Sequence, residues 1–177
     1  MIETIEINKQ FALAASYVNT TNEHLYLTGK AGTGKTTFLK YIKQNCHKKM
    51  VIAAPTGVAA MNAGGVTLHS LFQLPLGSFI PDQELSVDEQ GEFFDKKNLL
   101  KYLRLNSSKR NLLRELELLI IDEVSMLRAD LLDAIDTILK SVRRNSSSPF
   151  GGVQVLFIGD LFQLPPVVRN QEWSVLQ

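Results

Sequence analysis

The stretch GKAGTGKT, residues 29–36, decides the fold because it matches the phosphate-binding loop pattern G-x-x-x-x-G-K-[ST] at every position. It follows a short apolar run, residues 24–28, that reads as a buried strand. It precedes residues 36–42, which read as the start of a helix. Glycines let the backbone turn sharply and point its N–H groups at phosphate oxygens, and the helix N-terminus adds partial positive charge there. Lys35 can reach the β- and γ-phosphates of ATP, and the Thr36 hydroxyl can bind Mg²⁺.

Further apolar segments alternate with helical patterns along the chain. The continuous run LLII at 118–121 is typical of a strand covered on both faces. Other predicted strands span 50–54 and 153–158, and predicted helices span 8–18, 57–63 and 128–144. This alternation predicts βαβ crossovers, and therefore an α/β fold with a mostly parallel sheet flanked by helices. We expect the 177 residues to form a single domain, with an irregular insertion around residues 75–110.

Polar residues stand where four of the predicted strands stop. They are Thr28 and Gly29, Pro55 and Thr56, Asp122 and Glu123, and Gly159 and Asp160. In an open parallel sheet, functional residues gather at the carboxyl ends of the strands. The shared placement of these residues therefore predicts one composite site.

Asp122 and Glu123 directly follow the LLII strand. Phosphoryl transfer to water needs an acid that holds a metal ion and a group that orients the nucleophile. We expect Asp122 to hold Mg²⁺ and Glu123 to position and activate the attacking water. Gln163 lies beyond another strand end, on a loop stiffened by Pro165 and Pro166, and its amide can sense a γ-phosphate.

The segment APTGVAAMNAGGVTLHSLF, residues 54–72, offers neutral hydrogen-bond donors, among them Thr56, Thr67 and His69. Such groups suit sugar-phosphate contacts that do not read sequence, and His69 or Phe72 could stack on a base. A lone histidine is also commonly a structural hydrogen-bonding group, so both roles stay open for His69.

The charges of the predicted insertion are divided into two blocks. Residues 82–95 hold six acids and no bases, and residues 96–114 hold seven bases and no acids. One interpretation is a solvated loop whose acids neutralise a neighbouring basic helix. The other is a basic element that faces DNA. Residues 146–152, rich in serine, glycine and proline, read as a surface turn.

Composition excludes several classes of protein. A formal net charge of +1 argues against a protein that coats nucleic acid through overall basicity. The single cysteine, Cys46, cannot form an internal disulfide, which fits a cytoplasmic protein. No apolar stretch approaches the roughly 20 residues of a membrane helix, so no membrane partner is expected.

Four segments, in this order, resemble the PIF-type DNA helicases of superfamily one, subfamily B. They are GKAGTGKT, APTGVAA with GGVTLHSLF, LLIIDEVSMLRADLLDAID, and FGGVQVLFIGDLFQLPPVV. The long forms of the last three segments are far more specific than a phosphate loop alone. The resemblance covers most of the chain outside roughly residues 76–110, and it implies a three-layer RecA-like ATPase domain.

The resemblance also implies ATP-driven 5′-to-3′ translocation on single-stranded DNA, with Mg²⁺ as cofactor. It implies catalytic roles for Lys35, Glu123 and Gln163, metal binding by Thr36 and Asp122, and DNA contacts from Thr56, Thr67 and His69. Gln10 sits where the family has its adenine-reading glutamine. The implied nucleotide-binding residues are Gln10, Gly29, Ala31, Gly32, Thr33, Gly34, Lys35, Thr36 and Thr37.

One part of the family pattern is missing, because the family needs a second RecA-like domain that supplies arginines to the γ-phosphate. This chain stops at Gln177, so we expect the first ATPase domain alone, monomeric and nearly inactive in isolation. Arg128 and Arg169 match no such arginine and read as surface residues.

Two alternatives remain. The exonuclease-V alpha-subunit (RecD-like) helicases share the phosphate loop, a Thr-His pair and a G-D-x-x-Q-L-P segment, although the SMLRADLLDAID run and the doubled proline favour the PIF type. The second alternative is a nucleotide-dependent interaction module without motor activity.

Overall fold

A five-stranded parallel sheet forms the centre of the computed structural model, which describes residues 8–81 and 93–167. The strand order is β1-β7-β6-β2-β3, and every neighbouring pair is parallel, as predicted. The strands are β1 (Leu25–Thr28), β2 (Met50–Ala54), β3 (Val66–Thr67), β6 (Leu118–Ile121) and β7 (Gln154–Gly159). β7 begins and ends one residue later than its sequence pattern indicates, which brings Gly159 into the sheet.

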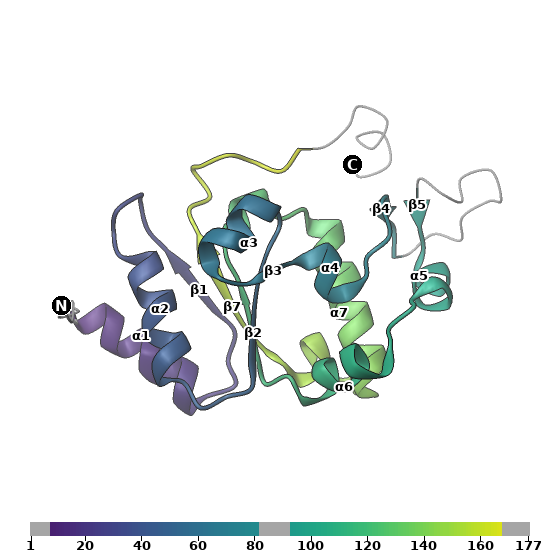
Figure 1. Cartoon of the computed structure of the whole chain (residues 1–177), viewed down its shortest axis with the longest axis horizontal. Helices are drawn as coiled ribbons and strands as arrows, with labels where there is room; N and C mark the ends of the chain where they lie inside the picture. Colours follow the sequence, from purple (N-terminus) through teal and green to yellow (C-terminus); the bar gives the residue numbers. More distant parts are fainter. Residues whose placement is uncertain (1–7, 82–92, 168–177) are drawn as a thin grey trace.

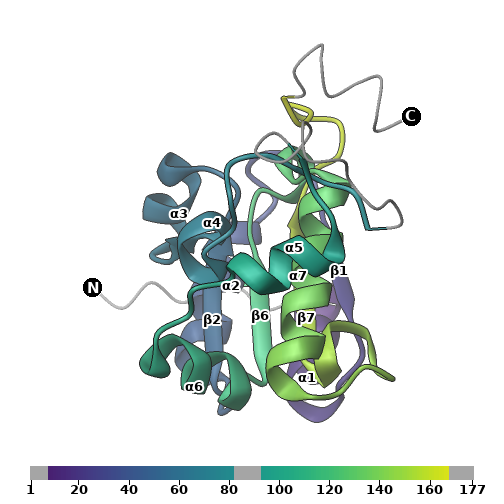
Figure 2. The same ribbon diagram turned by 90° about the vertical axis from the view of Figure 1, so that its right-hand side faces the viewer.

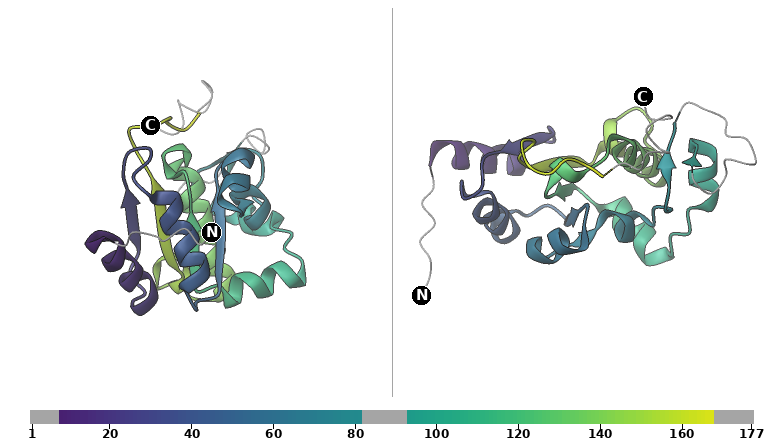
Figure 3. Two further views of the ribbon diagram at one scale, coloured as in Figure 1. Left: turned by 60° about the vertical axis from the view of Figure 1, so that its left-hand side comes forward. Right: turned by 90° about the horizontal axis from the view of Figure 1, so that it is seen from above.

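Helices cover both faces of this sheet (Figure 1). α1 (Lys9–Thr20) and α2 (Lys35–Asn45) pack on one face. The other face carries α4 (Leu68–Phe72), α5 (Lys96–Tyr102), α6 (Ser107–Glu115) and α7 (Ala129–Arg143). The same division is visible from above in the right-hand view of Figure 3. The expected three-layer arrangement is therefore present. None of the helices in the described ranges is long and apolar enough to cross a membrane.

The LLII strand, β6, is packed between the helices of both faces of the sheet. Leu118 and Ile120 belong to the cluster under α1 and α2, whereas Leu119 and Ile121 belong to the cluster under α4 to α7. All four side chains are fully buried. A strand with helices on both faces needs apolar residues at every position, because successive side chains point to opposite faces.

Local hydrogen bonds define where the helices of the N-terminal half begin and end. Asn8 caps α1, where its Oδ1 accepts from the Phe11 N–H at 2.8 Å. α3 (Gly57–Ala63) ends at Gly64, which adopts the left-handed conformation with φ of 63°. A Cβ on Gly65 would lie 2.3 Å from the Ile52 carbonyl oxygen, so the chain can return along β2 only with glycine here.

The predicted insertion contains a second, small sheet. β4 (Ser78–Phe79) pairs in parallel with β5 (Phe93–Phe94), and α5 follows directly (Figure 1). Most of the acidic block, residues 82–92, lies outside the described residues. Whether these acids neutralise the basic block, or the basic block faces DNA, stays a prediction.

The predicted surface turn at residues 146–152 is wrong at Gly151, although Pro149 and Gly152 are exposed. Pro149–Gly152 form a short 3-10 helix, η3, in which Gly151 is buried. A Cβ on Gly151 would lie 2.8 Å from the Leu139 carbonyl oxygen in α7. Phe150 draws the segment inward, because its ring stacks edge-on against His24 at 5.3 Å and Phe157 at 6.4 Å.

Candidate active site

The phosphate loop joins β1 to α2, as its sequence predicts. Gly32 and Gly34 have φ values of 78° and 95°, a region that other residues rarely adopt. Gly34 stands at the N-cap position of α2 and has no side chain to occupy the first N–H groups of the helix. These N–H groups, together with the helix dipole, make the loop a ready anion site.

Lys35 bends back over the loop. Its ammonium group donates to the Gly29 carbonyl and, at 3.1 Å, to the Lys30 carbonyl. The Thr33 hydroxyl also donates to the Lys30 carbonyl, at 2.8 Å, which holds the loop compact. Ala31, Thr36 and Thr37 are exposed. The loop therefore brings the Lys35 ammonium, the N-terminus of α2 and the exposed Thr36 together.

Asp122 lies at the carboxyl end of β6, where its N–H donates to the Ala53 carbonyl of β2 at 2.9 Å. Burial raises the pKa of Asp122 above its ordinary value, while a hydrogen bond from the Glu123 N–H and the charge of Lys35 oppose that shift. Because the Lys35 charge acts on Asp122, the phosphate loop and the acid pair belong to one electrostatic site.

Glu123 adopts the left-handed conformation, with φ of 53° and ψ of 46°. This costs a residue with a Cβ roughly 1–2 kcal/mol. The chain turns at Glu123 into the 3-10 helix η2 (Val124–Met126), and the Asp122 Oδ1 accepts from the Glu123 N–H at 3.0 Å. Strain of this kind gathers at functional sites.

Gly159 brings η2 against the end of β7. A Cβ on Gly159 would lie 2.9 Å from both the backbone nitrogen and the Cγ1 of Val124. The next residue, Asp160, is only 8% exposed. Its carboxylate accepts from the Phe162 N–H at 3.1 Å, and its carbonyl accepts from the Gln163 N–H at 2.9 Å. Asp160 thus shapes the turn that carries Gln163.

The sequence pattern places Gly159 and Asp160 at a strand end but predicts no specific role for either residue. Their order is a usable signal, because the glycine ends a buried strand and the acid follows it directly. Phe162 and Gln163, two and three positions after the acid, lie in the exposed turn. Gln163 itself is exposed, as its predicted role requires.

Thr56 and Thr67 lie at the ends of the neighbouring strands β2 and β3, where Ala54 and Thr67 are partners in the register. Both threonines cap helices. The Thr56 Oγ1 accepts from the Ala59 N–H at 3.2 Å, and the Thr67 Oγ1 accepts from the Ser70 N–H at 3.1 Å. Each hydroxyl oxygen is held through this accepted bond, and neither hydroxyl donates a hydrogen bond to another residue in the part of the chain that the structure describes.

His69 is half-buried in α4. Burial lowers its pKa, the charge of Arg128 adds to that effect, and the charge of Asp130 opposes it. The shift favours the neutral imidazole over the imidazolium. A neutral ring can donate one hydrogen bond or stack on a base, but it does not offer a full positive charge to a phosphate.

Arg128 is not the surface residue that the sequence suggests. Its side chain is 16% exposed and forms an ion pair at 2.9 Å with Asp130, whose side chain is 5% exposed. It also donates to the Ser78 hydroxyl at 2.6 Å, and Asp130 accepts from the Phe79 N–H at 3.1 Å. The pair is buried because β4 folds over the start of α7. Arg169 lies outside the described residues.

Gln10 occupies the first turn of α1 and is exposed. Phe11, its neighbour, stacks edge-on against Phe38 at 5.0 Å and Tyr41 at 5.1 Å, both in α2. Gln10 therefore lies on a helix fixed against the helix that begins at Lys35. Its adenine contact stays a prediction.

The strand order arranges the candidate residues in a row along one edge of the sheet. In the order β1-β7-β6-β2-β3, the strand ends carry the phosphate loop, the Gln163 turn, Asp122 with Glu123, Thr56 and Thr67. Figure 1 shows the phosphate loop, α3 and the segment after β7 at the upper end of the molecule. The nucleotide candidates occupy one half of this edge and the strand-contact candidates the other.

Comparison with known proteins gives the family. The sequence model described as PIF1-like helicase matches residues 4–175. The chain is 40% identical over 150 residues to the ATP-dependent DNA helicase PIF1 of Candida albicans, a match that covers 82% of this chain and 15% of the relative. It is 38% identical over 151 residues to ATP-dependent DNA helicase PIF1 of Danio rerio, covering 85% of this chain and 21% of the relative.

Comparison with solved structures gives the same family. Bacteroides Pif1 in complex with ADP-AlF4 is 44% identical with a TM-score of 0.82, and the match covers 98% of this chain and 36% of that one. Bacteroides Pif1 bound to ssDNA is 44% identical with a TM-score of 0.81 and the same coverage. Both comparisons confirm the RecA-like fold, and the family match disfavours the RecD-like alternative. The chain belongs to the PIF1-like helicase family.

Proposed function

We propose that this chain is the ATP-binding and ATP-hydrolysing first motor domain of a 5′-to-3′ helicase that acts on single-stranded DNA. The observation that carries the proposal is the row of groups on adjacent strand ends, in which a phosphate loop, an acid pair and the Gln163 turn follow one another across β1, β7 and β6. The family's named activity and the Bacteroides Pif1 structures with nucleotide analogue and with ssDNA support it.

The residues of the loop and of β6 suit ATP and Mg²⁺. The amides of the glycine loop and Lys35 would hold the phosphates. The exposed Thr36 hydroxyl and the Asp122 carboxylate are hard oxygen ligands of the kind Mg²⁺ prefers, and they belong to the two elements that Lys35 links electrostatically. When bound, the ion neutralises charge on the phosphates. Gln10, Ala31, Thr33 and Thr37 complete the proposed nucleotide contacts.

Glu123 is the proposed general base. It would accept a proton from water while the water oxygen bonds to the γ-phosphorus and the bond to the ADP oxygen breaks. The left-handed turn holds its carboxylate apart from that of Asp122, so that one acid serves the metal and the other the water. Gln163, on the turn shaped by Asp160, would hydrogen-bond the γ-phosphate and lose that bond after hydrolysis.

Thr56, Thr67 and His69 are the proposed strand contacts. The two hydroxyls keep a hydrogen for phosphate oxygens, and the neutral His69 suits a hydrogen bond or a stacking contact. Such contacts do not read sequence. We expect affinity for single-stranded DNA to depend on salt more than on base composition.

A second RecA-like domain would complete the nucleotide cleft. The chain spans only 15–21% of the curated relatives described above and 36% of the Bacteroides Pif1 chains. Arginines from such a domain would stabilise the transition state, an effect of about 10³–10⁵-fold in related enzymes. Because these arginines would come from the other domain, the 177 residues alone should hydrolyse ATP slowly. We further propose that the whole protein works in the cytoplasm as a monomer.

Stimulation by DNA separates the proposed motor from an interaction module without motor activity. In the whole protein that carries this chain, single-stranded DNA should raise the rate of ATP hydrolysis, and the double variant Thr67→Ala with His69→Ala should lose most of that stimulation while keeping the basal rate. An ATPase rate that is indifferent to DNA would favour the interaction module.

A further inference from the structure

An open hollow of about 510 Å³ lies far from the candidate site, where α6 and α7 end. Its lining consists of Arg114, Val142, Arg143, Arg144, Asn145 and Gly151. In Figure 2, α6 and the lower end of α7 lie beside the start of β6, whereas the phosphate loop belongs to the opposite, carboxyl edge of the sheet. The hollow is therefore separate from the proposed nucleotide and DNA contacts.

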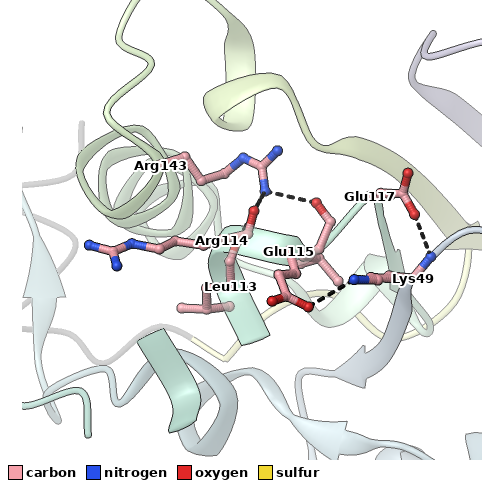
Figure 4. A network of polar contacts seen from close by, with 7 residues as sticks. Lys49, Leu113, Arg114, Glu115, Glu117 and Arg143 are labelled. Atoms are coloured by element: carbon pink, nitrogen blue, oxygen red, sulfur yellow. Dashed lines mark hydrogen bonds and ion pairs between the residues drawn. The ribbon is translucent and has the colours of Figure 1, made fainter. Parts of the chain in front are cut away.

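Arg143 has a structural task in the hollow. Its Nη1 donates to the carbonyls of Leu113, Arg114 and Leu116 at 3.1, 2.6 and 2.8 Å. Its Nε donates to the Gly151 carbonyl at 2.8 Å. Figure 4 shows this guanidinium beside the carbonyls at the end of α6. Arg143 thus ties α6 to η3 and fixes one wall of the hollow.

The other two arginines keep most of their donors. Within the described residues, the Arg114 side chain donates only through its Nε, to the Val142 carbonyl at 3.3 Å. Its guanidinium points away from the carbonyls that accept from Arg143 (Figure 4). Within residues 8–81 and 93–167, the terminal nitrogens of Arg114 and the whole Arg144 guanidinium make no hydrogen bond or ion pair. Four N–H groups of Arg114 and five of Arg144 therefore make no hydrogen bond within the described residues.

The nearby carboxylates do not balance these charges. Glu115 pairs with the Lys49 ammonium at 2.9 Å, and the Glu117 carboxylate accepts from the backbone N–H of Lys49 at 2.8 Å, on the side away from Arg114 (Figure 4). Asp136 pairs with Lys140 at 2.7 Å. The C-terminal carbonyls of α7 attract cations, but a helix end carries only about half an elementary charge. That is too little to neutralise three guanidinium groups.

We propose that this hollow binds phosphate groups. Guanidinium is always charged, and its planar fork matches phosphate oxygens in bidentate pairs. A volume of about 510 Å³ suits a ligand with several phosphates better than a single ion. The side-chain amide of Asn145 adds a neutral donor at the rim. The ligand is either a free polyphosphate or the backbone of a nucleic acid, which offer the same chemistry.

Amide-resolved NMR titration tests this proposal, because it reports the phosphate loop and the hollow separately. We expect tripolyphosphate or a dT8 oligonucleotide to shift the amides of Asn145 and Gly151. The double variant Arg114→Gln with Arg144→Gln should weaken that response at least about tenfold, because it removes both open guanidiniums. The amides of Gly32 and Gly34 should respond to tripolyphosphate as before. Lys35→Ala should give the converse pattern.

The single variant Arg144→Gln guards against misfolding, because this side chain makes no hydrogen bond or ion pair within the described ranges. It should weaken the response in the hollow and leave the rest of the spectrum unchanged. A response to tripolyphosphate alone identifies a free polyphosphate, and a response to dT8 at lower concentration identifies a nucleic acid. Unchanged affinity in both arginine variants, or no response of Asn145 and Gly151 to either ligand, would overturn the proposal.

Discussion

Among single residues, Lys35 takes part in two interactions, one within its own loop and one with Asp122. Its ammonium donates to two carbonyls of its own loop, and its charge also acts on Asp122. The same side chain therefore holds the loop together, and we propose that it also binds the phosphates of ATP, which would compete for the same ammonium.

Lys35→Ala should weaken binding of ATP about 10–100-fold, because a hydrogen bond to a charged group contributes about 1.5–3 kcal/mol. Lys40→Ala is a matched control, since Lys40 is exposed in the same helix. Isothermal titration calorimetry measures both. Equal affinities for the two variants would remove Lys35 from the nucleotide site.

At the scale of elements, the Arg128–Asp130 pair joins the start of α7 to β4. Arg128→Met leaves the buried Asp130 carboxylate without its main partner, which should lower the free energy of unfolding by about 3–5 kcal/mol. Lys49→Met breaks the Lys49–Glu115 pair, whose side chains are 65% and 63% exposed, and should leave stability nearly unchanged because solvent screens such a pair. Urea denaturation compares them, and similar losses would mean that the Arg128 pair is no more important than a surface pair.

The contact between η2 and β7 gives a second prediction at this scale. Gly159→Ala places a Cβ 2.9 Å from Val124 and should displace the turn that carries Glu123. We expect a loss of about 1–3 kcal/mol of stability and a fall in kcat with little change in ATP affinity. Gly57→Ala is the control, because a Cβ there meets nothing within 4 Å. Undiminished kcat in Gly159→Ala would show that η2 does not need this close approach.

The elements also show what the sequence could predict. LLII and GKAGTGKT were interpretable because burial on two faces and phosphate binding each leave a local pattern. Arg128 was misread because its partners include Ser78, which is distant in the chain and is brought close only when β4 folds over α7. The burial of Gly151 within residues 146–152 was not predicted for a similar reason, because the packing of the neighbouring Phe150 against His24 is a tertiary contact.

At the scale of the whole molecule, strand order turns separated motifs into one edge. Residues 29–36, 122–123 and 163 are far apart in sequence, but β1, β7 and β6 are neighbours. β2 and β3 extend the same edge with Thr56 and Thr67. The Asp122 N–H donates to the Ala53 carbonyl, which joins the end of β6 to the end of β2. The proposed nucleotide contacts and the proposed DNA contacts therefore lie on adjoining strands.

We propose that the residues at the carboxyl ends of these strands position Glu123 to activate water for ATP hydrolysis. The most direct measurement is single-turnover hydrolysis by Glu123→Gln in the whole protein with single-stranded DNA present. The amide keeps the size of the side chain but cannot accept the proton, so the rate should fall about 10²–10⁴-fold while ATP affinity stays within about twofold. Hydrolysis by Glu123→Gln at the wild-type rate would contradict the account.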